Sequence, residues 1–318
     1  MKKLILFASA GFILFSCNEE EEAPKVAPDT VVKGVITNAD GNTAWLETFK
    51  SEKYSATVNA KGEFEIKVLL KEPTCFDLVN GKAKTYLCLA PGDTVNVSFD
   101  AKDIEKTVKY DGKNAKFPNY LADKKRNIDA MMISEFQFLY SLPTDSFLLL
   151  AEKSVSKWNT AYDAIKGDTN INKTFIANEE KALKYDRAAL FLDYGIWYKK
   201  FKMIDSVPGF EKVLETTKDA NPANASDLSM ESYRNFLNSY ININAEKELA
   251  ADTALKSNPE GAEKAKWLAI EKNIIDSAVK DYLKFNFIIR NSALSFVAEE
   301  KNKFKAATKD TVYLKLLK

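Results

Sequence analysis

The stretch YSATVNAKGEFEIKVLL, residues 54–70, indicates β structure. Phe64 and Ile66 alternate with charged residues, and the Lys61-Gly62 pair before them supplies a turn. Alternation with a period of two gives a strand one apolar and one polar face. The stretch therefore predicts two half-buried strands separated by a turn.

Neighbouring segments extend this pattern over residues 31–111. Asp40-Gly41 marks another turn, and Pro91-Gly92 has the preference of a type II turn. Short strands at this spacing predict an antiparallel β-sandwich or small barrel of six to eight strands. The strand-like runs are VVKGVI (31–36), TAWLETF (43–49), CFDLV (75–79), TYLCL (85–89) and TVNVSFD (94–100).

Residues 112–318 show a helical period instead. Leu183, Leu190 and Trp197 share one face of a long amphipathic segment, and Thr144-Asp145 is a cap signal for a helix that we expect to end at Gly167. This region predicts an all-α domain of six or seven helices. The fold class is therefore α+β, with a β domain followed by a helical domain.

The first 16 residues are typical of a secretory leader. Lys2 and Lys3 precede an apolar run, Leu4 to Phe15, which is too short to span a bilayer. The residues around Cys17 resemble a bacterial lipobox, which implies a lipid anchor on the Cys17 sulfur and an envelope location at the outer membrane. The alternative is an ordinary secretory signal with an incidental cysteine. The lipid would make the membrane a partner.

An acidic run follows this cysteine, and residues 17–30 form a predicted tether. Like charges repel and extend a chain, so the run suits a solvated spacer. It also resembles the surface-export signal of Bacteroidota lipoproteins, and both roles are compatible. The acidic residues are Glu19, Glu20, Glu21 and Glu22.

Composition excludes several functions. The 318 residues contain no histidine, which removes Ser-His-Asp triads and histidine-ligated zinc. No phosphate-binding glycine loop and no CxxC motif occur. The net charge of +1 offers no basic field for nucleic acid. We therefore predict no catalytic residue, metal or cofactor, and no nucleic-acid partner.

Cys75 and Cys88 flank a predicted hairpin, CFDLVNGKAKTYLC. A loop centred on Gly81-Lys82 places the two cysteines directly opposite each other, within about 5 Å. An exported protein can hold a disulfide there. The alternative is two buried thiols, because a turn on Asn80-Gly81 would shift the register.

The segment 173–202 is rich in aromatic and charged residues. The aromatic side chains predict either a groove for a glycan or peptide or, as we favour at this helical spacing, core packing. Asp186-Arg187 and Asp193 suit either a buried or a surface ion pair. The aromatic residues are Tyr185, Phe191, Tyr194, Trp197, Tyr198 and Phe201.

A recurring Asp-[Ser/Thr]-[aliphatic or Ala] pattern is similar to the O-glycosylation sequon of Bacteroidota envelope proteins. The alternative is chance combined with helix capping, since Asp and Ser/Thr begin helices and turns. The candidate acceptors are Thr30, Thr94, Ser206, Thr253, Ser277 and Thr311.

Residues 31–310 resemble the β domain and connecting helices of TlpA-like thiol–disulfide oxidoreductase lipoproteins of Bacteroidota. The resemblance rests on structural motifs: VKGVITNADGN (32–42), YSATVNAKGEFEIKVLLKEPT (54–74), TYLCLAPGDTVNVSFDA (85–101), SYRNFLNSYIN (232–242) and DSAVKDYLKFNFI (276–288). In that family a segment like TKDTVYLKLLK (308–318) leads to a thioredoxin fold with a CxxC motif. The resemblance implies a fragment, or a form without the redox domain.

Two functional hypotheses follow. The first is a non-catalytic accessory region that presents a thioredoxin-fold domain or partner. The second is a stand-alone binding lipoprotein that captures a peptide, glycan or protein partner on its helical domain. Neither gives this chain an enzymatic activity of its own.

Overall fold

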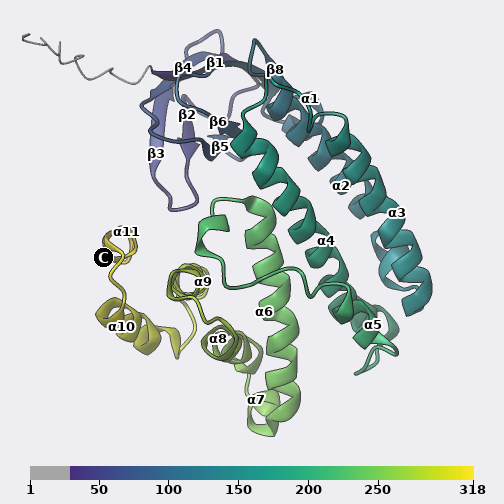
Figure 1. Ribbon diagram of the computed structural model, residues 1–318. Coiled ribbons are helices and arrows are strands. Elements are labelled where there is room, and N and C mark those ends of the chain that lie inside the picture. Colours follow the sequence, from purple (N-terminus) through teal and green to yellow (C-terminus); the bar gives the residue numbers. More distant parts are fainter. Residues whose placement is uncertain (1–28) are drawn as a thin grey trace, which may run out of the picture.

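The computed structural model describes residues 29–318, in which a β region precedes a helical region (Figure 1). Eight strands form two four-stranded sheets, with orders β4-β1-β7-β8 and β3-β2-β5-β6. The predicted class and strand number are confirmed. The strands are β1 (Thr30–Thr37), β2 (Thr43–Glu47), β3 (Lys53–Thr57), β4 (Glu63–Val68), β5 (Thr74–Asn80), β6 (Ala83–Leu89), β7 (Thr94–Asp100) and β8 (Lys109–Asp111).

Strand β4 carries the alternation that the sequence shows. Phe64, Ile66 and Val68 are buried, while the charged residues between them are exposed. The buried faces of both sheets meet in one apolar core that includes Val32, Leu46 and Leu78. The turns at Gly41 and Gly62 carry the chain from one sheet to the other, because β1 and β4 lie in one sheet and β2 and β3 in the other.

The prediction of a wholly antiparallel sandwich is wrong for one strand pair. β1 and β7 run parallel, with Gly34 opposite Val97. Alternation alone does not distinguish the two orientations, because side chains change faces with the same period in both. A Cβ atom on Gly34 would overlap the carbonyl oxygen of Val97, so the internal glycine permits this close approach.

The β5–β6 hairpin has the predicted register. Asn80 pairs with Ala83 across a two-residue turn at Gly81 and Lys82, and Cys75 stands directly opposite Cys88. Gly81 has a positive φ of 56°, which suits glycine in such a turn. The structure joins Cys75 and Cys88 in a disulfide.

The change from strands to long helices falls between Asp111 and Lys116. Seven described helices have eleven residues or more, in agreement with the predicted six or seven. The sequence did not indicate the short elements α1, α5, α7, α11 and η1. The helices are α1 (Ile104–Thr107), α2 (Lys116–Tyr140), α3 (Thr144–Asp163), α4 (Lys173–Lys202), α5 (Phe210–Glu215), the 3-10 turn η1 (Ala225–Asp227), α6 (Glu231–Ala251), α7 (Thr253–Ser257), α8 (Gly261–Asn273), α9 (Ser277–Arg290), α10 (Val297–Ala307) and α11 (Thr311–Leu316).

The predicted cap of α3 is wrong. The N-cap residue is Pro143, and Thr144 already belongs to the helix. The Thr144 hydroxyl instead donates to the carbonyl oxygen of Pro208 at 2.5 Å and lies 3.2 Å from the hydroxyl of Tyr194. This tertiary bonding replaces the local cap. The helix also ends at Asp163, four residues before Gly167.

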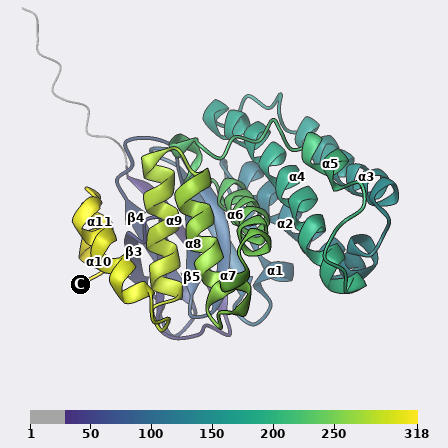
Figure 2. The same ribbon diagram turned by 90° about the horizontal axis from the view of Figure 1, so that it is seen from below.

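The helices form two groups with separate cores, and α4 contributes to both (Figure 1). Helices α2 and α3 pack on one side of α4, and α6 packs on its other side. Helices α6, α8 and α9 lie side by side beneath the β region (Figure 2). None of the helices in residues 29–318 is long and apolar enough to cross a bilayer.

Strand β6 contacts the helical region at two places. Cys88 and Ala90 of the β region pack with Phe117 and Leu121 of α2. The hydroxyl of Tyr86 donates to the backbone carbonyl of Ser229, just before α6, at 3.2 Å. The N-terminal ends of α2 and α6 therefore both contact β6.

Candidate functional site

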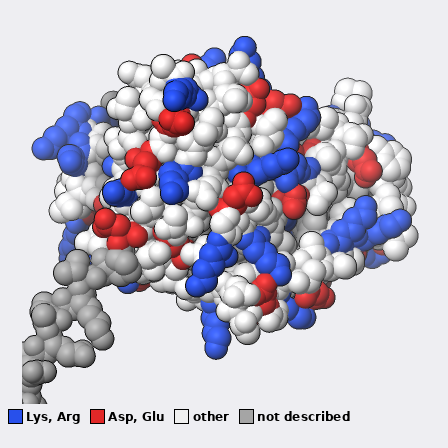
Figure 3. Space-filling view, turned by 90° about the horizontal axis from the view of Figure 1, so that it is seen from above, with Lys and Arg blue, Asp and Glu red and all other residues white. Residues whose placement is uncertain are grey.

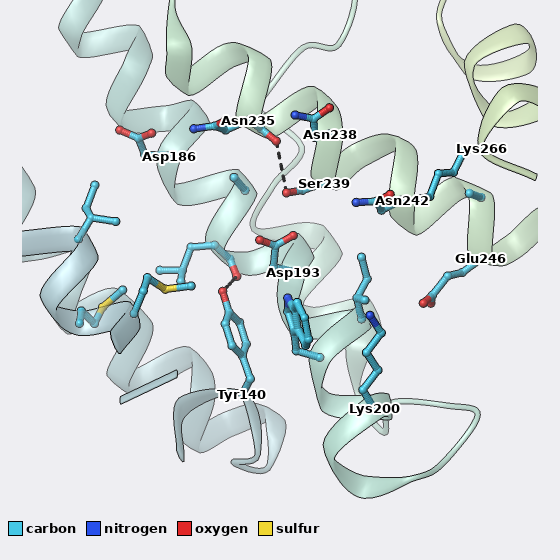
Figure 4. Close-up of a pocket in the computed structure, with 18 of the residues that line it drawn as sticks. Tyr140, Asp186, Asp193, Lys200, Asn235, Asn238, Ser239, Asn242, Glu246 and Lys266 are labelled. Atoms are coloured by element: carbon cyan, nitrogen blue, oxygen red, sulfur yellow. Dashed lines mark hydrogen bonds between the residues drawn. The ribbon is translucent and has the colours of Figure 1, made fainter. Parts of the chain in front are cut away.

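A cavity of about 690 Å³, here called the central cavity, opens between α2, α4 and α6, with α8 at one end (Figure 4). Helix α4 forms its floor, because α4 packs on both neighbouring helices. The wall from α2 is apolar and contains Ile128, Met131 and Met132. From α4, Ile196 and Trp197 add to this apolar surface. The opposite wall differs in chemistry.

The wall from α6 carries a row of side-chain amides. Asn235, Asn238 and Asn242 are spaced i, i+3 and i+7, so they share one helix face, while Tyr233 and Phe236 are buried on the other. No hydrogen bond within residues 29–318 involves the side-chain amide of these three residues. Each amide therefore keeps two donors and an acceptor free for a ligand.

Asp193 of α4 lies on the floor, between Ser239 and Tyr140 in the view of Figure 4. Its side chain is half-buried, and no Lys or Arg of the described chain forms an ion pair with it. Burial raises the pKa of the Asp193 carboxyl to about 6, although a hydrogen bond from Ser239 opposes the shift. The cavity therefore contains an uncompensated acid.

A second cavity of about 180 Å³ continues the first toward the β region. Ile128, Asp186 and Asn235 line both, so the two cavities form one groove between α2 and α6. We call this pair of cavities the groove. Both disulfide cysteines line its far end.

Lys124 of α2 connects this helix to α4 at the second cavity. Its Nζ lies 2.7 Å from Oε1 of Glu179 and 3.0 Å from Oδ2 of Asp186, and Tyr120 donates a hydrogen bond to Glu179 at 2.9 Å. Burial opposes the charge of Lys124, but the carboxylates of Asp186 and Glu179 hold its pKa above the usual range. Burial raises the pKa of Glu179, and Lys124 counters that rise.

The predicted aromatic residues of α4 are mainly core. Tyr185, Phe191 and Tyr194 are buried, whereas Trp197 also lines the central cavity. The charged residues separate: Asp186 pairs with Lys124, Arg187 pairs with Glu152 of α3, and Asp193 stays without an ion pair in the described chain. The core interpretation therefore holds for most of the cluster, and Trp197 is the member of these six that also lines the central cavity.

The candidate glycosylation residues occupy unlike positions. Thr30 is buried, and its hydroxyl donates to the carbonyl oxygen of Ala90, so the folded chain does not present it. The other acceptors, Thr94, Ser206, Thr253, Ser277 and Thr311, are exposed. The aspartates before the last three, Asp252, Asp276 and Asp310, are the N-caps of α7, α9 and α11. Capping thus accounts for half of the pattern, and modification stays a prediction.

Other predicted residues lie outside this site. Cys17 and Glu19–Glu22 fall outside the described residues 29–318. Within that range, no group of three Cys, Asp or Glu side chains is placed to hold a metal ion. Lys and Arg alternate with Asp and Glu over the face in Figure 3, without a patch of one sign.

Two features of the groove were not predicted from the sequence. The amides of α6 could have been found from the sequence, because three asparagines at helical spacing lie within a predicted helix and not beside a turn. The Lys124 cluster had none, because its members are 55 and 62 residues apart. In comparisons with known proteins, no family model, curated sequence or solved structure matches the chain.

Proposed function

We propose that this chain is a non-catalytic binding lipoprotein of a bacterial envelope, with its ligand site in the groove between α2 and α6. The observation that supports it is the row of free amides facing an apolar wall. Ligand sites in proteins combine an apolar surface with a few placed polar groups. The lipid anchor on Cys17 is part of this proposal and would hold the site at the outer membrane.

Blocking the amide wall tests the proposal. Asn238 is exposed, so Asn238→Trp fills the groove without disturbing a core. Lys247→Trp is the matched control, because Lys247 is exposed on the opposite face of α6, nine residues along. We expect a ligand found in a panel of blocked pentapeptides and neutral oligosaccharides to be lost with Asn238→Trp and retained with Lys247→Trp. Equal binding by both variants would reject the groove as the site.

A second candidate function is the accessory role beside a thioredoxin-fold domain or partner. The position of the Cys75–Cys88 disulfide favours it, because both cysteines line the end of the groove and Cys75 is half-exposed. A thioredoxin-fold partner seated there would find a disulfide within reach. Trapping with a thioredoxin variant that lacks its resolving cysteine tests this: a mixed disulfide with Cys75 or Cys88 supports it, and no adduct contradicts it.

A further inference from the structure

We propose that the central cavity binds a cationic side chain of an extended peptide, with Asp193 as the counter-ion and the amides of α6 along the peptide backbone. This inference rests on the proposed function, because it assigns a ligand class to the same groove. The occupant is a peptide segment that carries lysine or arginine.

The charge balance of the central cavity points to a cation. The other acidic side chains that line it, Asp186 and Glu246, already have basic partners. Of the basic residues in the lining, Lys266 pairs with Glu263, and Lys200 stands at the exposed rim with its Nζ 4.3 Å from the centre of the Trp197 ring. Helices α2 and α3 present no charged group to this cavity. Asp193 is thus the acid of the described lining that has no Lys or Arg partner.

A cation from outside would remove this imbalance. A half-buried carboxylate loses part of its hydration, and an opposite charge with a hydrogen bond compensates that loss. A neutral sugar or a neutral side chain would cover Asp193 and leave its charge unpaired, which costs free energy. The ligand that gains most from this floor is therefore an ammonium or guanidinium group.

The wall opposite the amides suits the stem of such a side chain. Met131, Met132 and Ile128 form an apolar surface from α2, and Ile196 extends it along α4. Lysine and arginine bury their methylene stems on apolar surface while the charged head reaches a polar partner. Methionine side chains adapt to such stems because they are flexible and polarizable.

The amide row matches the repeat of an extended backbone. Asn235, Asn238 and Asn242 span seven residues of helix, which is about 10 Å at the helical rise. An extended peptide covers this length with about three residues. Each amide can both donate to a backbone carbonyl and accept from a backbone N–H. The row therefore offers sequence-independent contacts, and Asp193 supplies the selectivity.

Calorimetric titration of the full chain in detergent tests the assignment. The probes are two blocked pentapeptides, acetyl-Ala-Ala-Lys-Ala-Ala-amide and its norleucine analogue, which has an apolar stem without the charge. We expect the lysine peptide to bind at least tenfold more tightly at pH 8. Asp193→Asn should abolish that preference. The control Glu248→Gln, at an acid of α6 that pairs with Lys272 outside the cavity lining, should keep it.

The pH dependence adds a readout that a purely structural role of Asp193 would not give. Because the pKa of Asp193 is about 6, the lysine preference should weaken several-fold between pH 8 and pH 5, while the norleucine peptide binds unchanged. If the two peptides bind equally, or if a neutral oligosaccharide binds as tightly as the lysine peptide, and Asp193→Asn has no effect, the cation assignment is overturned. The groove would then remain a binding site. No binding of any probe would overturn both.

Discussion

Lys50 Nζ lies 2.8 Å from Oδ2 of Asp310, although 260 residues separate the two in the chain. Lys50 stands in the loop between β2 and β3, and Asp310 is the N-cap of α11. Asp310 also accepts hydrogen bonds from the backbone N–H groups of Val312 and Tyr313. One carboxylate thus begins a helix and attaches it to the β region.

Because Asp310 has two roles, we expect substitutions of Lys50 and Asp310 to lower the free energy of unfolding by different amounts. Lys50→Ala should lower the free energy of unfolding by less than about 1 kcal/mol, because the pair is partly exposed. Asp310→Ala should cost about 1–2 kcal/mol, because it also removes the cap. Denaturant melts of both variants and the double variant measure the coupling. Equal effects of the two single substitutions would contradict the capping role.

Because of Asp193, we expect the free energy of unfolding to fall as the pH rises. Its pKa of about 6 in the folded chain exceeds the 3.8 of an unperturbed carboxyl, so the folded state binds more protons between these values. The free energy of unfolding should therefore decrease from about pH 4 to 6. Asp193→Asn should remove this decrease and stabilise the chain by roughly 1–3 kcal/mol at pH 7.5, with little change at pH 4.

The control for this substitution is on the same helix. Asp186→Asn deprives Lys124 of one of its two carboxylates, so it should destabilise the chain at pH 7.5. Thermal melts at both pH values check the pair of variants. Loss of stability in Asp193→Asn at pH 7.5 would show that the carboxylate is compensated in solution.

We expect substitution of Lys124 to lower the free energy of unfolding by a large amount. Lys124→Met leaves the carboxylates of Glu179 and Asp186 buried without their cation, which should cost about 3–5 kcal/mol at pH 7. Its neighbour Lys125 pairs with Asp129 on the surface of α2, so Lys125→Met should cost less than about 1 kcal/mol. Urea melts compare the two. Similar midpoints for both variants would mean that water enters the Lys124 cluster.

The Cys75–Cys88 disulfide predicts the absence of free thiols at these positions. Thiol titration of the unreduced chain in denaturant should find none from Cys75 and Cys88, and reduction should add two. The variant with serine at both positions should lose roughly 1–3 kcal/mol of stability, less than the chain-entropy value of about 3 kcal/mol, since the hairpin already restricts the loop. The chain should show no disulfide reductase turnover. Turnover that Cys75→Ser abolishes would overturn the non-catalytic interpretation.

Local sequence patterns predicted those parts of the fold that depend only on residues close together in the chain. The alternation of Phe64 and Ile66, and the register that places Cys75 opposite Cys88, follow from strand geometry and turn chemistry within a hairpin. The long helices follow from apolar spacing over many turns. These features need no information from distant parts of the chain, although the sequence left open a second hairpin register, with its turn on Asn80-Gly81, which the structure does not adopt.

Contacts between residues far apart in the chain could not be predicted from such local patterns. The parallel alignment of Gly34 with Val97 and the burial of Lys124 against Asp186 each join segments more than 60 residues apart. Thr144 looked like a cap, yet its hydroxyl bonds to Pro208 because α5 is packed nearby. The groove depends on how three helices assemble, so its residues could be named from the sequence only in part.

The parallel alignment of β1 with β7 also sets an order of events during synthesis. β1 leaves the ribosome first, but its place between β4 and β7 is complete only when the chain has been made as far as Asp100. Until then one edge of β1 is open to pairing with other chains. A nascent chain that stops short of β7 therefore has an unfinished first sheet.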